Sequence, residues 1–485
     1  MHKEIRNTEP TALWNHFADL NAIPRPSKKE ERIVAFMVDF GKKLGLETQV
    51  DGIQNVLIKK PATKGFENKK TVVLQSHLDM VHQKNNATQF DFESEGIKMN
   101  ITDGWIHALG TTLGADNGIG VAAIMAVLSS TTLEHPAIEA LFTVDEETGM
   151  TGAMELQPGF LSGDILLNLD TEDDDEISIG CAGGIDITGA TEYPEIKNSR
   201  EVSFEISISG LNGGHSGMDI HKGLGNANKL LNRVLLQLES DINFNLVSFQ
   251  GGNLRNAIPR EAKAGISLDL SEIQKFDNSF ADIIATLTKE FQIQEKNLKI
   301  AAVKIDNPQL CMSPDFQKTL LRTIAAIHNG VFSMNAKIPE LVETSNNLAR
   351  ITVSKGNLEI ACLTRSFSES GKTNLVNSIQ SVFELAGFNS KISGDYPGWE
   401  PNPNTEICSI LQSTYKQLFH EEPNTMACHA GLECGILGTH YPTMEMISFG
   451  PTIRGAHSPD EKVNIKSTEK FWKFFLEILK RIPNK

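Results

Sequence analysis

Three short apolar segments in this chain each lead directly to histidine or acidic residues. The segments are 71–75 (TVVLQ), 138–144 (IEALFTV) and 165–169 (ILLNL). A largely apolar stretch of helical length, 118–129, separates the first segment from the second. Buried strands that alternate with helices are typical of an α/β domain with a mixed or parallel central sheet. The chain is therefore predicted to build its core on such a sheet, with polar side chains at the strand ends.

The pattern changes near residue 187. Apolar and polar residues alternate strictly over 202–208, as in a strand with one face in water, and 351–363 is predicted to form a β-hairpin. These features indicate an antiparallel sheet, and hence a second, α+β domain. The predicted organisation is an α/β domain, 1–186 and 399–485, interrupted by an inserted domain, 187–398, with a return linker near 396–401.

The first apolar strand ends in a histidine and an aspartate. His77 and Asp79 are two residues apart, and in an extended chain such residues point to the same side. A metal-ligating histidine needs this arrangement, because a neighbouring carboxylate takes its second ring N–H and fixes the tautomer. A pair of surface side chains is the alternative interpretation.

A glycine-rich turn contains the next candidate, Asp116. The turn, GTTLGADNGIG (110–120), leads directly into the apolar helix. Glycines let a backbone approach a phosphate, but a carboxylate in the middle of the turn would repel that anion unless a cation lay between them. A metal-ligating turn is the functional interpretation, and an ordinary capped helix start is the alternative.

Acidic residues follow the other two strands. Glu146 and Glu147 are adjacent, and burying like charges is costly unless a cation or a proton compensates. Neighbouring side chains at a strand end diverge, so one can bind a metal while the other faces the substrate as a base. A solvated acidic loop is the alternative. Asp170 is the candidate after the third strand, and the acids at 172–176 are predicted to be solvated.

His457 lies in a glycine- and proline-rich loop beyond a further apolar stretch. In α/β sheets, ligands gather outside the carboxyl ends of the strands, so the strand-end residues and the two loops are expected to meet. Two histidines with three or four carboxylates suit a pair of divalent cations, zinc first, with cobalt or manganese as alternatives.

Composition narrows the classes of function. The formal charge of −16 argues against a nucleic-acid footprint or an anionic-membrane anchor. The sequence has no apolar run of membrane-spanning length and no signal-peptide pattern, so a cytoplasmic protein is expected. The six cysteines form no C-x-x-C pair, which favours free thiols over a disulfide framework or a cysteine zinc site.

Several motifs, taken in order, resemble the M20 family of dizinc metallopeptidases, and within it the carnosinase-type dipeptidases. They are SHLDMV (76–81), GTTLGADNGIG (110–120), DEETGM (145–150), LNLD (167–170), GGHSG (213–217), GGNLRNAIPR (251–260), HAGLECG (429–435) and GPTIRGAHSPDE (450–461). The resemblance covers essentially the whole chain. It implies that Asp116 bridges two zinc ions, one also held by His77 and Asp170 and the other by Glu147 and His457.

The same resemblance assigns the remaining catalytic roles. Glu146 matches the general base, and Asp79 matches the carboxylate that orients His77. An aspartate at position 170 is found in aminopeptidase-like members, whose substrates have a free amino group. The implied reaction is hydrolysis of Xaa-His dipeptides, β-Ala-His included. Another amide hydrolase of the same scaffold, such as an N-acyl amino acid deacylase or a broader dipeptidase, is the alternative, and a non-catalytic protein that keeps the fold is a third interpretation.

By resemblance, the insertion 187–398 is the family's lid domain, through which a homodimer is expected to form. His215 resembles the lid histidine that contacts the scissile carbonyl, while Asn256 and Arg365 match positions that hold the substrate's carboxylate. Arginine suits that task because its planar fork can bind both oxygens, although a salt bridge within the lid is the alternative for Arg365. His429 and Glu433 lie in a segment near the family's substrate pocket.

Overall fold

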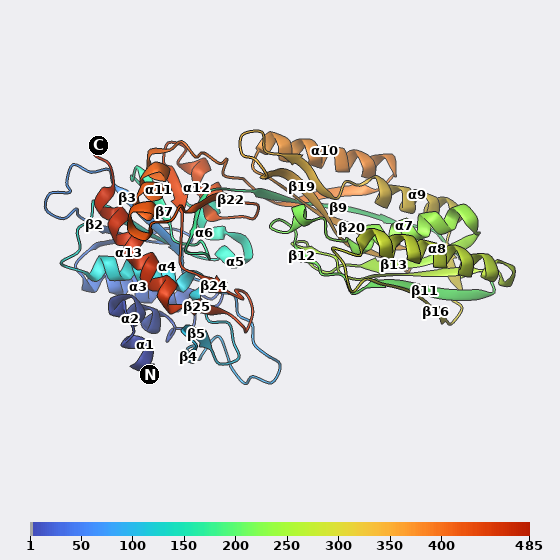
Figure 1. The fold of residues 1–485 in the computed structure, drawn as a ribbon, viewed down its shortest axis with the longest axis horizontal. Coiled ribbons are helices and arrows are strands. Elements are labelled where there is room, and N and C mark those ends of the chain that lie inside the picture. The colour runs from blue at the N-terminus through green and yellow to red at the C-terminus, as the bar shows by residue number, and fades with distance from the viewer. Residues whose placement is uncertain (1–2) are drawn as a thin grey trace. The chain divides into compact units, whose positions relative to one another are not determined.

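The computed structural model of the protein describes residues 3–485, which divide into two units (Figure 1). The first, called the α/β unit below, comprises the described residues up to Cys181 together with Trp399–Ala427 and Leu432–Lys485. The second, called the α+β unit, comprises Ala182–Gly398 and the short segment Cys428–Gly431. No feature of the sequence indicated that this last segment belongs with the second unit.

The α/β unit is built on a mixed eight-stranded sheet. Its strands in spatial order are β1 (Glu47–Val50), β2 (Val56–Lys60), β6 (Ile138–Thr143), β3 (Val72–His77), β7 (Ile165–Asn168), β23 (Glu445–Ser448), β8 (Glu176–Cys181) and β22 (Asn424–Cys428). Strands β6, β3, β7 and β23 are parallel, and β1, β2 and β8 pair antiparallel with their neighbours. The predicted α/β class with a mixed central sheet is confirmed.

The three apolar segments form β3, β6 and β7, and each of these strands is buried along its whole length. Strands covered on both faces have near-continuous apolar sequences, which explains why these segments do not alternate. In the parallel ladder His77 is opposite Thr143, and Gln75 is opposite Asn168. The carboxyl ends of all three strands therefore lie at the same edge of the sheet.

Helices cover this sheet. The helices of the α/β unit are α1 (Lys3–Arg6), α2 (Thr11–Leu20), α3 (Glu31–Lys43), α4 (Ala115–Ser129), α5 (Glu146–Gly149), α6 (Thr151–Glu155), α11 (Glu406–Phe419), α12 (Glu433–His440) and α13 (Ile465–Arg481). Helix α4 contacts both β3 and α2, and nearly all its residues are buried. Its apolar composition on every side is typical of a helix enclosed in a core.

Helix α3 is not capped as its sequence indicates. A serine followed three residues later by a glutamate, as in Ser27 and Glu30, is typical of a capping box and favours a helix near 28–44, but α3 begins at Glu31 and Ser27 does not cap it. The hydroxyl of Ser27 instead donates to Asp79 Oδ2 at 2.8 Å, and Glu30 Oε1 accepts the backbone N–H of Lys28. The serine thus supports a strand-end carboxylate, a long-range contact that local sequence does not indicate.

A small four-stranded sheet positions the C-terminal histidine loop. Its order is β24 (Ile453–Arg454), β25 (Lys462–Asn464), β5 (Trp105–Ala108) and β4 (Met99–Thr102). Because β24 and β25 pair antiparallel, they form the two sides of the loop 455–461, which contains His457. The loop is therefore held at both ends.

The α+β unit contains a nine-stranded sheet, antiparallel throughout. Its strands are β16 (Lys299–Ile305), β11 (Val202–Ser209), β15 (Ala262–Leu268), β13 (Phe244–Gly251), β19 (Val342–Ser354), β20 (Asn357–Ser366), β9 (Gly183–Glu192) and β21 (Asn389–Tyr396) in order, with β18 (Gly330–Met334) beside β19. The predicted hairpin is confirmed, since Ser354 pairs with Asn357 across a two-residue turn. Both turn residues, Lys355 and Gly356, have positive φ, as such a turn requires.

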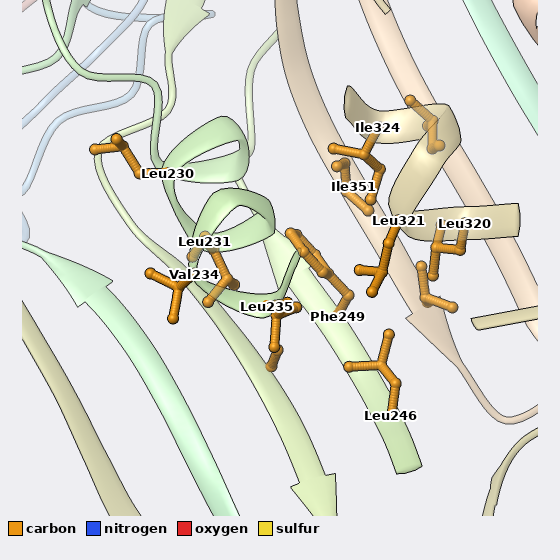
Figure 2. Close-up of a cluster of buried hydrophobic side chains, with 14 of the residues drawn as sticks. Leu230, Leu231, Val234, Leu235, Leu246, Phe249, Leu320, Leu321, Ile324 and Ile351 are labelled. Atoms are coloured by element: carbon orange, nitrogen blue, oxygen red, sulfur yellow. The ribbon is translucent and has the colours of Figure 1, made fainter. Parts of the chain in front are cut away.

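Four helices lie along one face of this sheet (Figure 1): α7 (Ala227–Asp241), α8 (Ile273–Phe291), α9 (Pro314–Ala326) and α10 (Glu369–Leu385). Figure 2 shows Leu231 and Leu235 of α7 and Leu321 of α9 with Phe249 of β13 in the core beneath them. Helix α9 begins where the pair Ser313-Pro314 favours a helix start: Ser313 caps it and Pro314 is its first residue.

Two sequence expectations concern the chain as a whole. Cys311, Cys362, Cys408 and Cys434 are buried free thiols, as expected, and Cys181 is buried as well. Among residues 3–485 no helix combines the length and the apolar character needed to cross a membrane.

Candidate dinuclear metal centre

The common edge of β3, β6 and β7 brings four candidate side chains together. His77 is the last residue of β3, Asp170 follows β7 by two residues, and Glu146 and Glu147 are the first residues of α5 after β6. Asp145, the residue just before α5, has a left-handed backbone conformation that turns the chain sharply. The three strand ends are thus as close as their parallel register predicts.

Asp116 faces a different histidine with each of its carboxylate oxygens. Its Oδ1 lies 3.2 Å from His77 Nε2, and its Oδ2 lies 3.2 Å from His457 Nε2. Asp170 Oδ1 is 3.6 Å from the same nitrogen of His77, and Glu147 Oε2 is 2.9 Å from that of His457. Two groups of ligand atoms therefore share one carboxylate.

Each group has the dimensions of a metal site. The ligand atoms of His77, Asp116 and Asp170 all lie within 4.8 Å of one another, and so do those of Asp116, Glu147 and His457. Tetrahedral ligands at ~2.1 Å from a zinc ion are about 3.4 Å apart, close to the separations here. Glu147 Oε1 is also buried without a hydrogen-bond partner, an acceptor free for a cation.

The acids of the centre repel one another. Burial raises the pKa of Glu146 and of Asp170 well above the ordinary range, and nearby carboxylates add to the shift. Burial and the charge of Asp116 raise the pKa of Glu147 as well. Hydrogen bonds to Asp116 and Glu147 raise the pKa of His457 to about 11. A cluster with these shifts attracts positive charge, and divalent cations supply it.

His77 is oriented from behind. Its Nδ1 lies 3.3 Å from Asp79 Oδ1, on the ring edge opposite the nitrogen that faces Asp116. Burial would lower the pKa of His77, but Asp170, Asp116 and Asp79 raise it well above its usual value. The fully buried Asp79 in turn accepts the backbone N–H groups of Glu146 and Glu147, at 3.0 and 3.2 Å.

Glu433 lies beneath the centre in the α/β unit. Its Oε2 accepts from Gln75 Nε2 at 2.6 Å and from Thr143 Oγ1 at 2.7 Å, while its Oε1 is buried without a hydrogen-bond partner. Burial raises the pKa of Glu433 to about 7. Its charge contributes to the raised pKa values of Glu146 and Asp170, so it belongs electrostatically to the same cluster.

The other predicted substrate residues are connected within the α+β unit. His215 is in β12 (Gly214–His215), which pairs with β14 (Ala257–Ile258), directly after Asn256. The backbone carbonyl of Asn256 accepts from Ser216 N at 2.8 Å. Arg365 Nε donates to Ser216 Oγ at 3.4 Å. His429 is buried and contacts Ser345 Oγ at 2.9 Å, on the strand residue opposite Arg365.

Arg365 makes no ion pair among the described residues. Its Nη1 donates to Tyr396 Oη at 2.8 Å, so the contact partners of its guanidinium are neutral. Arg365 therefore forms no salt bridge with another described residue, contrary to the alternative interpretation. Its role in binding a substrate stays a prediction.

The glycines of the 110–120 turn have a packing role: a Cβ at Gly114 or Gly118 would lie 2.5 or 2.6 Å from the buried guanidinium of Arg25, so they make room for that side chain. One sequence expectation for the α/β unit requires correction. The acids at 172–176 are not simply solvated. Asp173 and Asp174 form ion pairs with Arg454 and Lys470, and burial raises the pKa of Glu172 to about 8.

Sequence reasoning also missed polar residues around the ligands. Asn117 Nδ2 donates to Asp170 Oδ1 and to the carbonyl of Leu169, the latter at 2.6 Å. Glu461 accepts backbone N–H groups of the Asp116 turn. Asn117 follows Asp116 directly, and Glu461 lies four residues after His457, but nothing in these two motifs distinguishes either residue from a solvated one.

Comparison with known proteins is consistent with this geometry. Residues 73–481 match the model of peptidase family M20/M25/M40. The chain is 43% identical, over 483 residues, to the cytosol non-specific dipeptidase of Escherichia coli (strain K12), covering 99% of this chain and all of that protein. The crystal structure of aminoacylhistidine dipeptidase from Vibrio alginolyticus is also similar, with a TM-score of 0.90 and 42% sequence identity. The match covers 100% of this chain and 99% of that one.

A more distant structure shows the same fold. A tripeptidase from Staphylococcus aureus is 18% identical, with a TM-score of 0.57 and coverage of 98% of this chain and 99% of that one. The family match spans most of the sequence, and the full-length identity to a dipeptidase is high. The chain therefore belongs to peptidase family M20/M25/M40 and is a metallopeptidase.

Proposed function

We propose that the protein is a dinuclear metallo-dipeptidase that hydrolyses Xaa-His dipeptides, β-Ala-His among them. The observation that supports this most is the position of Asp116, whose two oxygens each lie 3.2 Å from the Nε2 atom of a different histidine. A shared carboxylate of this kind is what two neighbouring cations need. The names of two full-length relatives support a dipeptide as the substrate.

In this proposal His77 and Asp170 would hold one ion, Glu147 and His457 would hold the other, and Asp116 would be shared by both. Two bound divalent cations, zinc first, with cobalt or manganese as alternatives, would polarise the peptide carbonyl and lower the pKa of a shared water towards about 7. The mixture of imidazole and carboxylate ligands fits these metals.

Glu146 is the general base. Its Oε2 lies 3.9 Å from His77 Nε2. Glu146 is therefore next to a predicted ligand, but it is not in either of the two ligand groups that include Asp116. It takes the proton of the attacking water and later delivers it to the amine of the leaving histidine. The raised pKa that burial gives Glu146 suits the second step, because the protonated carboxyl is then a stable donor.

The same proposal gives substrate contacts to five further residues. His215 would donate to the oxyanion, Asn256 and Arg365 would hold the substrate's carboxylate, and His429 and Glu433 would line the pocket. The hydrogen-bond connections of the first four within the α+β unit, and the unpaired oxygen of Glu433, support these roles. The α+β unit would act as a lid and dimerisation domain, and sedimentation velocity would test the homodimer.

A panel of substrates tests the activity. We expect protein reconstituted with Zn²⁺ to hydrolyse β-Ala-His and Gly-His and to leave an N-acetyl amino acid intact, with release of free histidine measured by chromatography. Metal-stripped protein is the control. If the protein hydrolysed the N-acetyl amino acid and left both dipeptides intact, it would be a deacylase instead.

A broader dipeptidase is the second candidate, because the E. coli relative is named a non-specific dipeptidase. Adding Gly-Leu and Gly-Gly to the panel separates the two. A kcat/KM for these compounds equal to that for Gly-His would favour the broad specificity. We also propose a cytoplasmic location, in line with the cytosolic name of that relative.

A further inference from the structure

Glu461 is buried beside the candidate metal centre. It contacts the turn that contains Asp116, although the two residues are far apart in the sequence. Its exposed fraction is 2%, and its carboxylate faces the turn Leu113–Asp116 at the start of α4. One oxygen accepts the N–H groups of Leu113 and Gly114, at 2.6 and 2.9 Å. The other accepts those of Ala115 and Asp116, at 2.7 and 3.2 Å. Four consecutive backbone donors thus converge on one side chain.

The same turn is held from its other side by a cation. The guanidinium of Arg25 donates to the carbonyl of Gly114 at 2.6 Å and to the carbonyls of Leu78 and Asp79 at 3.0 Å each. Arg25 is fully buried, and burial lowers the pKa of its guanidinium to about 10, although the opposite charge of Glu461 acts to raise it. Burying a charged group costs less when its hydrogen bonds are made, and both oxygens of Glu461 accept hydrogen bonds here.

Glu461 also lies at the end of the loop 455–461 that contains His457. Its own N–H donates to the carbonyl of Ser458 at 3.1 Å, and Ser458 N donates to the carbonyl of Gly455 at 3.2 Å. His77 and Asp170 are at the ends of strands in the central sheet, whereas His457 is in this loop, with a half-exposed side chain. The position of His457 relative to Asp116 depends on what joins the loop to the turn.

We propose that Glu461 is a positioning residue for the dinuclear centre, which holds the Asp116 turn and the His457 loop in register so that the second metal ion can bind. This inference rests on the proposed function. Glu461 contacts no ligand side chain and acts through the backbone. Its loss should therefore weaken the ion bound by Asp116, Glu147 and His457 more than the ion bound by His77 and Asp170. Partners of metal ligands typically contribute 10- to 100-fold to metal affinity.

The test is Glu461→Gln, which keeps the size of the side chain but replaces one acceptor by an NH₂ group that faces backbone donors. Metal-free protein is titrated with Zn²⁺ by equilibrium dialysis, and the number of bound ions and both dissociation constants are measured. We expect one constant to rise about 10- to 100-fold while the other changes less. Excess Zn²⁺ should restore kcat with KM unchanged, which a general folding defect would not allow.

Asp460→Asn is the matched control. Asp460 is exposed, lies in the same loop, and loses the same charge on substitution. The Asp460→Asn variant should bind two ions, as the parent protein does. An equal weakening in both variants would overturn the proposal, because the effect would then be one of net charge.

Other outcomes are equally distinguishable. Two ions bound by Glu461→Gln with unchanged constants would overturn the positioning role and leave the proposed function intact. A parent protein that binds none of zinc, cobalt and manganese would refute the proposed function itself. If circular dichroism shows that Glu461→Gln does not fold, Glu461→Asp replaces it: the shortened carboxylate should also weaken one ion, and unchanged constants would again refute the role.

Discussion

Asp79 Oδ1 lies 3.3 Å from Nδ1 of the His77 ring, and both side chains are buried. The same carboxylate accepts the backbone N–H groups that open α5, where Glu146 and Glu147 begin. One side chain therefore fixes the orientation of a predicted ligand and the position of the predicted base. Its pKa is lowered by these contacts, although burial alone would raise it, so Asp79 is charged at neutral pH.

Asp79→Asn should weaken metal binding without changing the ligands. An amide cannot serve both as a carboxylate partner of the imidazole and as an acceptor for two N–H groups, so His77 loses its fixed orientation. Metal affinity or activity is expected to fall by about 10- to 100-fold, measured by zinc titration and β-Ala-His hydrolysis. Asp103→Asn, at an exposed turn of the same unit, is the control. Equal values for both variants would refute the orienting role.

Glu146→Ala should keep its metal and lose most of its turnover. Removing a general base typically costs about 10²- to 10⁴-fold in rate, because proton transfer from the water is then unassisted. The measurement is kcat with metal content determined on the same sample. Glu155→Ala, an exposed residue of the neighbouring helix α6, should have the activity of the parent protein. Undiminished turnover in Glu146→Ala would show that another residue is the base.

Asp116→Ala should lower the metal content itself. Both groups of ligand atoms include Asp116, so its removal leaves each with two protein ligands. Fewer than two ions per chain are expected by elemental analysis after dialysis. A variant that retains two ions would mean that the carboxylate does not bridge.

His429 should make the protein sensitive to mild acid. Burial, with the charge of Arg365, lowers the pKa of His429 to about 3, whereas an unfolded histidine titrates near about 6.5. Between these values the unfolded chain binds the extra proton, so stability falls as the pH decreases from about 6.5 towards 3 and is unaffected above. From pH 7 to pH 5 this contribution is about 2 kcal/mol.

The matching experiment compares urea unfolding at pH 7 and pH 5. His429→Gln should lose less stability between the two pH values than the parent protein does. His420→Gln, at an exposed position of the α/β unit, should behave like the parent. Identical pH dependence in all three proteins would contradict the prediction.

Leu321 should be important for the stability of the α+β unit. It is fully buried between α9 and the sheet, near Phe249 and Leu235 (Figure 2). Leu321→Ala is expected to lower the free energy of unfolding by about 2–5 kcal/mol, because the lost methyl groups leave a cavity. Leu385→Ala, at a position that is 90% exposed, should change it by less than about 0.5 kcal/mol. Similar losses in both would argue against this core.

Much of the α/β unit could be predicted because its signals are local. The segments 71–75, 138–144 and 165–169 are apolar without alternation, so they had to be buried strands, and the residues that end them had to share one edge if the strands were parallel. His77 and Asp170 became candidates by that argument, and so did the pair Glu146 and Glu147, of which only the resemblance to the family assigned the metal to Glu147. Asp116 was a candidate because a carboxylate in a glycine-rich turn would repel a phosphate unless a cation lay between them.

What local sequence could not supply are contacts between distant segments. Ser27 looks like a helix cap but donates to Asp79, and Glu461 looks like a loop acid but accepts four N–H groups of a turn more than three hundred residues earlier. Gly114 and Gly118 must lack a side chain because the guanidinium of Arg25 lies against them. Such contacts depend on which segments the fold brings together.

The sequence by itself determined the elements and the chemistry at their ends, since hydrophobic periodicity and residue type act within a few positions. Only the tertiary structure decided which oxygen of Asp116 faces which histidine, and which buried groups hold that carboxylate in place. The physical reason is that a metal centre needs ligand atoms placed to within about 0.5 Å, and that accuracy comes from packing and backbone hydrogen bonds between segments far apart in the chain.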